Sequence, residues 1–316
     1  MKLRNYGAIG LCLGGLMMAA EAPKPKPPAS NEVSADELYE AGKELFDTLA
    51  PPEVKERFEF PDKAQWDAFA VRLQAALENN DLAALATFEP EARAALTALR
   101  TLSGDEDYID WLEERLDYIE AAKQTTHRPP PRPPPALPGR QAQFIPHYDL
   151  WLQRLQARPK PARADQLIPG LSAVFAAAGL PRELAWLAEV ESTLNPSARS
   201  PAGARGLFQL MPATAREMGL STFMPDERTD PTKSAGAAAQ LLRALHGKFG
   251  DWPLALAAYN AGAGRVQRTL DRQQAKTFAE IASALPAETR MYVPKVLATL
   301  QVRAGVPLEK LAPPRA

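Results

Sequence analysis

The sequence contains few residues that could build a disulfide or a transition-metal site. Its 316 residues include one cysteine and three histidines. The cysteine is Cys12, and the histidines, His127, His147 and His246, are scattered along the chain. A chain with one cysteine cannot form an internal disulfide, so its fold must depend on packing alone. With no glycine-rich phosphate loop either, the sequence predicts no metal site and no cofactor.

Net charge is also nearly absent, at −1, but this value hides a division along the chain. Residues 30–125 carry 23 acidic and 9 basic side chains, a balance of −14, whereas residues 126–316 carry 14 acidic and 24 basic ones, a balance of +10. Two solvated surfaces of opposite sign would explain this, as would a basic half that meets an anionic polymer. No stretch interleaves aromatic and basic residues, so no nucleic-acid partner is predicted.

The N-terminus has the pattern of an export signal. Lys2 and Arg4 precede an apolar run at 8–20 that ends in small residues. The run is too short and too rich in glycine for a membrane span. Residues 1–22 therefore predict a signal peptide and a protein of the periplasm or cell envelope. An N-terminus that stays uncleaved, or is lipidated at Cys12, would instead associate the protein with the membrane.

Proline is abundant, with 31 residues, nearly twice the usual share of about 5%. The densest run lies in 126–139, which we interpret as a Pro-rich linker. Consecutive prolines hold an extended conformation of about 3.1 Å per residue and make a stiff spacer. Such a run could instead bind a proline-reading domain.

Residues 30–125, before this linker, predict a small acidic helical bundle. Three segments there, Ser34–Glu37, Asp62–Gln65 and Ser103–Glu106, have the pattern of a capping box, and apolar residues at helical spacing follow each of them. No titratable cluster in this region has a catalytic spacing, so its own function is unknown. Its charge suggests that it docks a basic envelope protein or regulates access to a cleft.

Residues 140–312 are again helical, without a convincing alternating strand, so the predicted fold class is all-α. The apolar segments at helical spacing are 144–155, 167–178, 181–190, 232–249, 253–259 and 292–302. The loops between them are rich in glycine, proline, asparagine and serine. Short helices joined by such loops suit a lysozyme-like α domain.

Glu191 is the candidate catalytic residue. At about 100° per residue it continues the apolar stripe of segment 181–192, whereas Glu183 and Glu189 point away from that stripe. Burial raises the pKa of a carboxyl group, as a general acid near neutral pH requires. Periodicity alone allows equally a glutamate that caps or borders the core. The segment 200–212, which joins glycines and apolar residues to one amide side chain, favours a ligand site.

Four segments, taken in order, resemble the soluble lytic transglycosylase family. They are Glu191-Ser192, Ser200-Pro-Ala-Gly-Ala-Arg-Gly-Leu-Phe-Gln-Leu-Met-Pro-Ala-Thr-Ala215, Ala257-Ala-Tyr-Asn-Ala-Gly262 and Glu288-Thr-Arg-Met-Tyr-Val293. Asp226–Pro231 and Phe144–Trp151 are most similar to its membrane-bound D-type branch. The resemblance covers 140–312 and implies a catalytic domain with a fold like that of goose-type lysozyme.

The resemblance also implies an enzyme that acts on peptidoglycan glycan strands. Its reaction cleaves the β-1,4 bond from N-acetylmuramic acid to N-acetylglucosamine. Glu191 would protonate the leaving oxygen and then accept a proton from the 6-hydroxyl of the muramoyl sugar, which closes a 1,6-anhydro ring. That internal nucleophile replaces the second carboxylate of ordinary glycosidases, so no partner carboxylate is expected beside Glu191.

The same resemblance assigns substrate-binding or supporting roles to residues in the other segments. They are Ser200, Gln209, Met211, Tyr259, Asn260, Glu288 and Tyr292. Tyr259 could equally be a core tyrosine at a helix end. Glu288 could be a helix-start charge that the helix dipole favours.

Two other functions remain open. One is a muramidase of goose-lysozyme type that uses water, which the lack of a suitable second carboxylate disfavours. The other is a non-catalytic wall-binding or scaffold protein on the same fold. An intact set of Glu191, Gln209 and Tyr259 argues against this last possibility. The sequence therefore predicts an exported peptidoglycan lytic transglycosylase.

Overall fold

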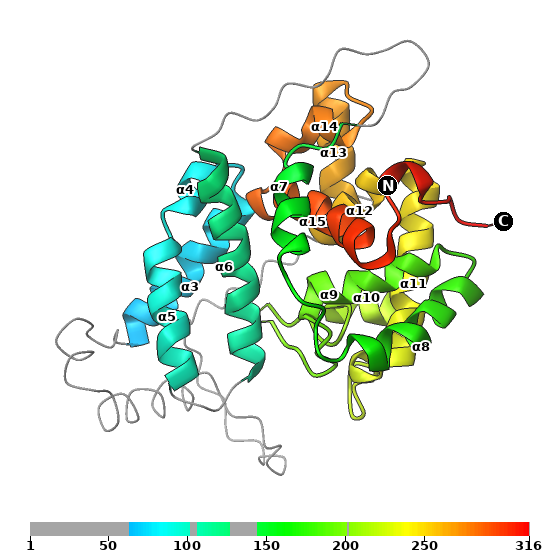
Figure 1. The fold of residues 1–316 in the computed structure, drawn as a ribbon, viewed down its shortest axis with the longest axis horizontal. Coiled ribbons are helices and arrows are strands. Elements are labelled where there is room, and N and C mark those ends of the chain that lie inside the picture. The colour runs from blue at the N-terminus through cyan, green and yellow to red at the C-terminus, as the bar shows by residue number, and fades with distance from the viewer. Residues whose placement is uncertain (1–62, 102–105, 127–143, 201, 316) are drawn as a thin grey trace, which may run out of the picture.

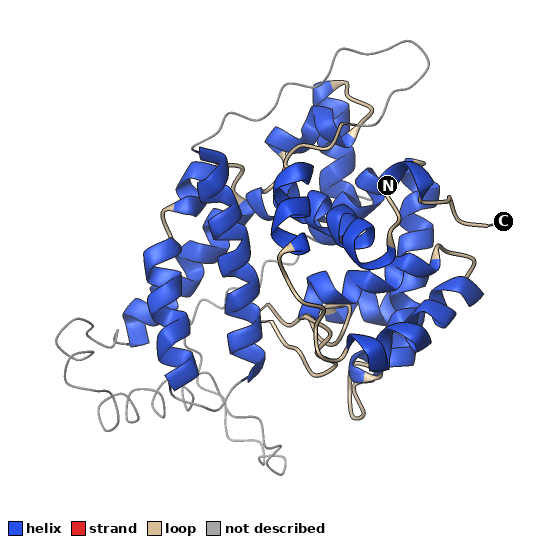
Figure 2. Cartoon of the chain, viewed as in Figure 1, coloured by secondary structure: helices blue, strands red, loops and turns tan. Residues whose placement is uncertain are grey.

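The described part of the chain is helical. The computed structural model describes residues 63–101, 106–126, 144–200 and 202–315. Within these ranges the only β pairing consists of two isolated bridges, Arg199 with Arg205 and Arg205 with Leu210 (Figure 2). The predicted all-α class is confirmed for these residues. None of their helices has the length and apolar character needed to cross a membrane.

The N-terminal bundle stands to one side of the molecule (Figure 1). It contains α3 (Lys63–Glu78), α4 (Leu82–Ala86), α5 (Glu89–Thr101) and α6 (Glu106–Thr126). Helix α6 continues through Thr126, the first residue of the predicted linker. The predicted signal peptide, the remaining linker residues, the whole Ser34–Glu37 capping box and the first residues of the other two boxes lie outside the described residues.

The remainder of the chain forms a larger set of shorter helices. Its elements are α7 (Tyr148–Gln156), α8 (Ala164–Ala177), η1 (Arg182–Trp186), α9 (Leu187–Ser192), α10 (Pro212–Glu217), η2 (Glu227–Thr229), α11 (Pro231–Phe249), α12 (Trp252–Ala261), α13 (Ala263–Gln273), α14 (Phe278–Ile281), η3 (Ala282–Ala284), α15 (Ala287–Ala304) and η4 (Leu308–Lys310).

Capping side chains, proline and glycine set the ends of the longer helices. The Asp230 side chain accepts a hydrogen bond of 2.8 Å from the Lys233 amide and caps α11, which Pro231 opens. The helix ends at Gly250, whose φ of 67° suits glycine. Gly262, with a φ of 86°, separates α12 from α13 in the same way. The turn after α12 therefore sets where the Ala257–Gly262 segment lies.

Helix α15 is the central element of the structure. Every residue from Met291 to Leu300 is buried. The helix packs against α7, α9 and α12 on one side and against α3 and α6 of the bundle on the other. In Figure 1 it runs through the middle of the larger part. The two regions are thus joined by one helix that both use.

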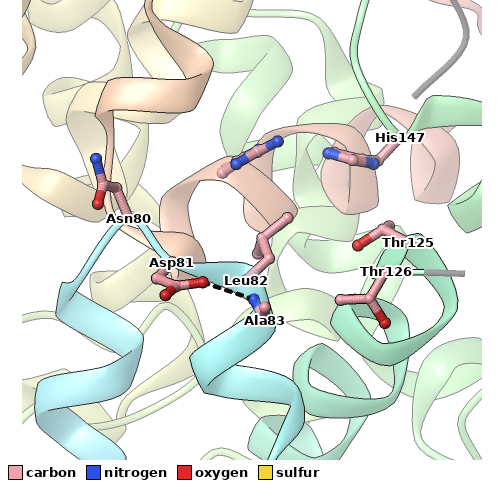
Figure 3. Close-up of a pocket in the computed structure, with 8 residues that line it drawn as sticks. Asn80, Asp81, Leu82, Ala83, Thr125, Thr126 and His147 are labelled. Atoms are coloured by element: carbon pink, nitrogen blue, oxygen red, sulfur yellow. Dashed lines mark hydrogen bonds between the residues drawn. The ribbon is translucent and has the colours of Figure 1, made fainter. Parts of the chain in front are cut away.

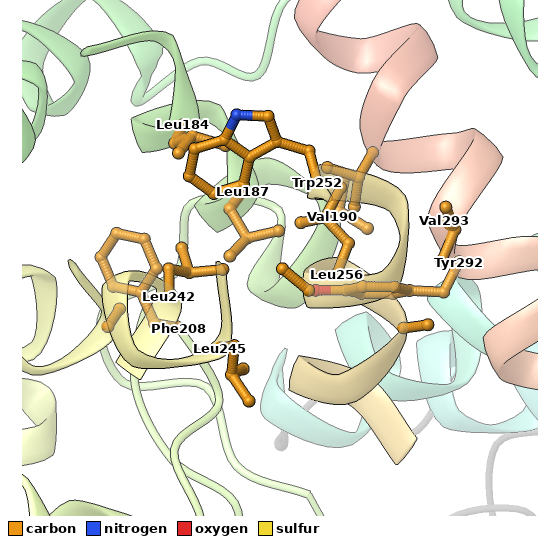
Figure 4. Close-up of a cluster of buried hydrophobic side chains, with 14 of the residues drawn as sticks. Leu184, Leu187, Val190, Phe208, Leu242, Leu245, Trp252, Leu256, Tyr292 and Val293 are labelled. Carbon is orange, nitrogen blue, oxygen red and sulfur yellow. The ribbon is translucent and has the colours of Figure 1, made fainter. Parts of the chain in front are cut away.

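The main hydrophobic core lies between η1, α9, α11, α12 and α15. Figure 4 shows Leu187 and Val190 of α9 converging with Trp252 and Leu256 of α12 and with Tyr292 of α15. All of these side chains are buried, with at most 4% of their surface exposed. Burial on this scale stabilises a fold by roughly 25 cal/mol per Å² of apolar surface. The end of α9 is consequently held in a rigid setting.

A second core joins the bundle to the C-terminal region. Apolar side chains of the bundle pack there with Trp151 and Leu155 of α7 and with Met291 and Ala298 of α15. The bundle thus shares its core with α7 and α15 and covers their apolar faces.

A buried ionic cluster lies within this second core. The Asp117 carboxylate of α6 is 3.1 Å from the Lys295 ammonium of α15 and 2.7 Å from the Arg154 guanidinium of α7, and it also pairs with Arg158. The Lys295 ammonium lies 4.6 Å from the ring centroid of Tyr118. Burial alone would raise the pKa of Asp117, but the three cations hold that pKa well below its usual range.

Removing the Asp117 carboxylate should weaken the junction strongly. We expect Asp117→Ala to lower the free energy of unfolding by about 3–5 kcal/mol, because it leaves Lys295 buried without its anion and removes one of the two carboxylates that pair with Arg154. Denaturant unfolding followed by circular dichroism measures this. Asp165→Ala, whose side chain is 90% exposed, is the matched control with almost no expected effect. A loss below about 1 kcal/mol for Asp117→Ala would show that the cluster does not hold the junction.

Candidate active site

Glu191 lies near the end of a short helix that follows a 3-10 turn. The sequence predicts one helix from Pro181 onward, but η1 forms first and α9 begins only at Leu187. The apolar residues predicted to share a face with Glu191 are fully buried, as expected. Glu191 itself is half-buried. Glu189 points elsewhere and pairs with Arg303 at 2.8 Å.

The backbone turns sharply just after Glu191. Thr193 and Leu194 both have positive φ values, 51° and 61°, which end the helix. The Ser192 hydroxyl lies 3.0 Å from the carbonyl oxygens of Ala188 and Leu207. It therefore ties the helix end to the following loop, which is packed close behind the carboxyl group.

Two tyrosines from distant helices surround Glu191. The Tyr292 hydroxyl of α15 donates a short hydrogen bond to Oε1 of Glu191. The Tyr259 hydroxyl of α12 instead donates to the carbonyl oxygen of Phe208 at 2.7 Å. Burial, followed by the charge of Glu191, raises the pKa of each hydroxyl well above its usual range. Both phenols thus remain protonated donors.

The loop after α9 is folded on itself. The Gln209 amide donates to the carbonyls of Gly206 at 2.9 Å and Ala198 at 3.2 Å, and its backbone has a φ of 44°. Ser200 accepts a bond of 3.0 Å from the Ala204 amide. Met211, just before α10, is 42% exposed. Of these three predicted residues, only Met211 presents a largely exposed side chain.

A buried arginine holds this loop in place. Arg228 of η2 pairs with Asp226 at 2.7 Å and donates to the carbonyls of Gly203 at 2.8 Å and Leu210 at 3.0 Å. A Cβ at Gly206 would lie 1.9 Å from the Arg228 carbonyl oxygen, so no larger residue fits there. The Asp226–Pro231 segment is thus the support of the loop.

Asn260 and Glu288 form a linked pair on the other side of the site. The Asn260 amide donates to Oε1 of Glu288 at 3.4 Å and accepts a bond of 2.6 Å from the Thr289 hydroxyl. These residues belong to α12 and α15. The structure therefore brings together the Glu191, Ala257–Gly262 and Glu288–Val293 segments, as the sequence predicted.

Helix α6 of the acidic bundle also reaches this site. The Arg115 guanidinium lies 2.8 Å from Glu114 and 3.5 Å from Glu288, joining the bundle to the Asn260 pair. Asp110, one turn earlier, accepts a bond of 3.0 Å from the Asn195 amide just after α9. The sequence analysis missed these residues, because no local pattern indicates that α6 packs beside α9.

The surroundings of Glu191 raise its pKa to about 8. Burial is the largest cause, the charges of Glu114 and Glu288 act in the same direction, and the Tyr292 hydrogen bond and the Arg115 charge lower the pKa. The pKa of Glu114 is also raised by burial, to about 7. The charge of Glu114, which lies outside the resembling region, is thus one of the influences on the pKa of Glu191.

The arrangement suits a general acid with a fixed proton donor beside it. A neutral carboxyl group can give its proton to a leaving oxygen and then serve as a base. Among the residues that the structure describes, no group of three or more histidine, cysteine or acidic side chains could hold a metal ion.

Comparison with known proteins identifies the same region. Residues 175–282 match the family model of the transglycosylase SLT domain. The membrane-bound lytic murein transglycosylase D of Escherichia coli is 42% identical over 38% of this chain and 27% of its own length. The soluble lytic murein transglycosylase of Salmonella typhimurium is 37% identical over 35% of this chain and 19% of its own.

Two other matches cover a larger share of this chain or of the matched protein. A putative tributyltin chloride resistance protein of an Alteromonas strain is 36% identical over 42% of this chain and 66% of that protein. The structure of the 70-kDa soluble lytic transglycosylase of Escherichia coli aligns with a TM-score of 0.43 and 19% identity, over 88% of this chain and 47% of that one.

The chain thus spans about a quarter of the length of its D-type relative. The matched region contains the Glu191 helix end, the loop behind it and the Tyr259 segment, whose mutual contacts are described above. Residues 175–282 match the transglycosylase SLT domain, and this region of the chain is similar to lytic murein transglycosylases.

Proposed function

We propose that this chain is an exported peptidoglycan lytic transglycosylase in which Glu191 acts first as acid and then as base. The observation that carries the proposal is the meeting of separate segments around one half-buried carboxyl group. Tyr292, Tyr259 and the 198–211 loop come from three different parts of the chain and converge on it. The names of the relatives, lytic murein transglycosylases, favour the same reaction.

In this mechanism the proton of Glu191 passes to the glycosidic oxygen as the bond from N-acetylmuramic acid to N-acetylglucosamine breaks. The resulting carboxylate accepts the proton of the muramoyl 6-hydroxyl, whose oxygen closes the 1,6-anhydro ring. Glu191 thereby returns to its protonated state. The Tyr292 hydroxyl stabilises the carboxylate between the two steps, because hydrogen bonds to a charged acceptor are the stronger ones.

The other predicted roles belong to this proposal. Met211 is the most accessible candidate for contact with a sugar, whereas Ser200 and Gln209 shape the loop and Asn260 and Glu288 support the site. Residues 140–312 would be the catalytic domain, residues 1–22 a signal for export to the periplasm or envelope, and 126–139 the linker. Binding of an envelope protein to the acidic region remains part of the proposal.

A muramidase that uses water is the alternative reaction. Glu114 lies close enough for its charge to raise the pKa of Glu191, and a pair of carboxyl groups is what ordinary glycosidases use. The two reactions leave different ends on the glycan. Product analysis therefore separates them.

Replacing the acid should abolish cleavage. We expect Glu191→Gln to lower the rate of murein digestion by at least about 10²-fold, because an amide cannot donate the required proton. Mass spectrometry of the wild-type digest should show 1,6-anhydro ends. Glu183→Gln, on the same segment but outside the site, is the control and should digest at the wild-type rate. Hydrated reducing ends without anhydro ends would identify a muramidase instead.

The pH dependence should move in opposite directions when the two neighbouring charges on α6 are removed. The rate should fall as pH rises through the pKa of Glu191, because only the protonated form donates. Glu114→Gln removes a negative charge and should shift this alkaline limb of the pH–rate profile to lower pH, on the order of one unit. Arg115→Met removes a positive charge and should shift the alkaline limb to higher pH.

Initial rates on isolated murein between about pH 5 and pH 10 measure both shifts. Glu113→Gln, whose partner is Arg100 at 2.7 Å, is the control on the same helix and should leave the limb in place. General damage to the fold would lower the rates of both variants without changing the pH at which each rate falls. Shifts of the same sign, or none, would contradict the proposed effect of α6.

A further inference from the structure

A polar pocket lies where the bundle meets the C-terminal region. Its volume is about 470 Å³, and its polar lining consists of Asn80, Asp81, Thr125, Thr126, His147 and Arg290. Figure 3 shows Asn80 and Asp81 on one side and Thr125, Thr126 and His147 on the other. The backbone is fixed beside it, because the Ala287 amide donates to the Asn79 carbonyl at 2.5 Å. The pocket is thus built from both regions.

Two nitrogen-bearing side chains in this pocket have unsatisfied hydrogen-bonding groups. Within the described residues, Arg290 makes no ion pair, and its buried Nε has no hydrogen-bond partner. His147 is 7% exposed, and its buried Nε2 is likewise unpartnered. Burial, followed by the charge of Arg290, lowers the pKa of His147 to about 4. Leaving such groups unpaired costs roughly 1–3 kcal/mol each, which an anionic ligand would offset.

This pocket is separate from the Glu191 site. Arg290 lies two residues from Glu288 and two from Tyr292 on α15, or about 200° around the helix from each. Those two residues contact Asn260 and Glu191. The Arg290 side chain therefore leaves the helix on the opposite face.

The opposite wall of the pocket carries a negative charge. One oxygen of Asp81 accepts bonds of 2.9 and 3.1 Å from the Ala83 and Ala84 amides and caps α4, while its other oxygen accepts none from the described residues. No ion pair joins Asp81 to Arg290 within those residues, so their charges lie apart across the pocket. Residues 127–143, which follow Thr126, contain no aspartate or glutamate that could neutralise Arg290.

We propose that this pocket binds a zwitterionic amino acid or peptide end. Its carboxylate would accept hydrogen bonds from the Arg290 guanidinium, the planar donor group that best matches a carboxylate, and from the N–H of neutral His147 in the tautomer that carries its hydrogen on Nε2. Its ammonium group would face Asp81. Asn80 supplies a further polar side chain to the lining. The site does not depend on the proposed reaction at Glu191.

Calorimetric titration of the full chain at neutral pH tests this inference. The probes are glycylglycine, which carries both charges, acetate and methylammonium. Glycylglycine should bind, and each singly charged probe should bind at least about tenfold more weakly. Arg290→Met should weaken glycylglycine binding by about tenfold or more. Asp81→Asn, which keeps a good helix cap, should weaken glycylglycine and leave acetate unchanged.

Arg182→Met, an exposed arginine far from the pocket in sequence, is the control and should bind like the wild type. If Arg290→Met fails to fold, two measurements still test the inference. One is glycylglycine binding by Asp81→Asn, and the other is the Nε2 nitrogen resonance of His147 in the wild type, which a bound carboxylate must shift. Absence of glycylglycine binding, or binding unchanged in both pocket variants, would overturn the inference. Acetate binding as tight as glycylglycine, with no effect of Asp81→Asn, would also overturn it by leaving a plain anion site.

Discussion

The partial burial of Glu191 is the constraint on which the site depends. Burial raises the pKa of this group to about 8, so it carries a proton at the pH where its chemistry is proposed to occur. Three helices create that burial. Helix α9 ends beside the carboxyl group, α15 places Tyr292 against it, and α6 adds the charges of Glu114 and Arg115. The pKa of Glu191 is therefore a property of the assembled molecule and not of the α9 segment alone.

The opposite charges of the two halves form ion pairs where the bundle packs on α7 and α15. Acidic side chains of α6 pair with basic ones of α7 and α15, above all Asp117 with Lys295 and Arg154. Part of the opposite charge of the acidic and basic regions is thus neutralised by ion pairs within the chain. Because the same contacts fix α6 beside Glu191, the bundle's stability and the acidity of Glu191 are linked. The Arg290 pocket lies along the same junction.

Local patterns predicted the helices and the meeting of the motif segments, and distant contacts account for what they missed. The stripe ending at Glu191 predicted its half-buried position. Helix α13 was missed because it is mostly polar and buries little besides Val266, Thr269 and Leu270. The inward fold of Gln209 depends on a positive φ that no periodicity reveals. Glu114 was missed because its proximity to Glu191 arises only when α6 docks on α15.

Direct titration of Glu191 tests the central claim most closely. Carboxyl carbon NMR of the full chain, with the resonance assigned by its absence in Glu191→Gln, reports the protonation of this one group. The account predicts a midpoint near pH 8, well above the ordinary value of 4.5 for a glutamate. A midpoint near that ordinary value would contradict it, because Glu191 would then be ionised at neutral pH and could not act as the acid.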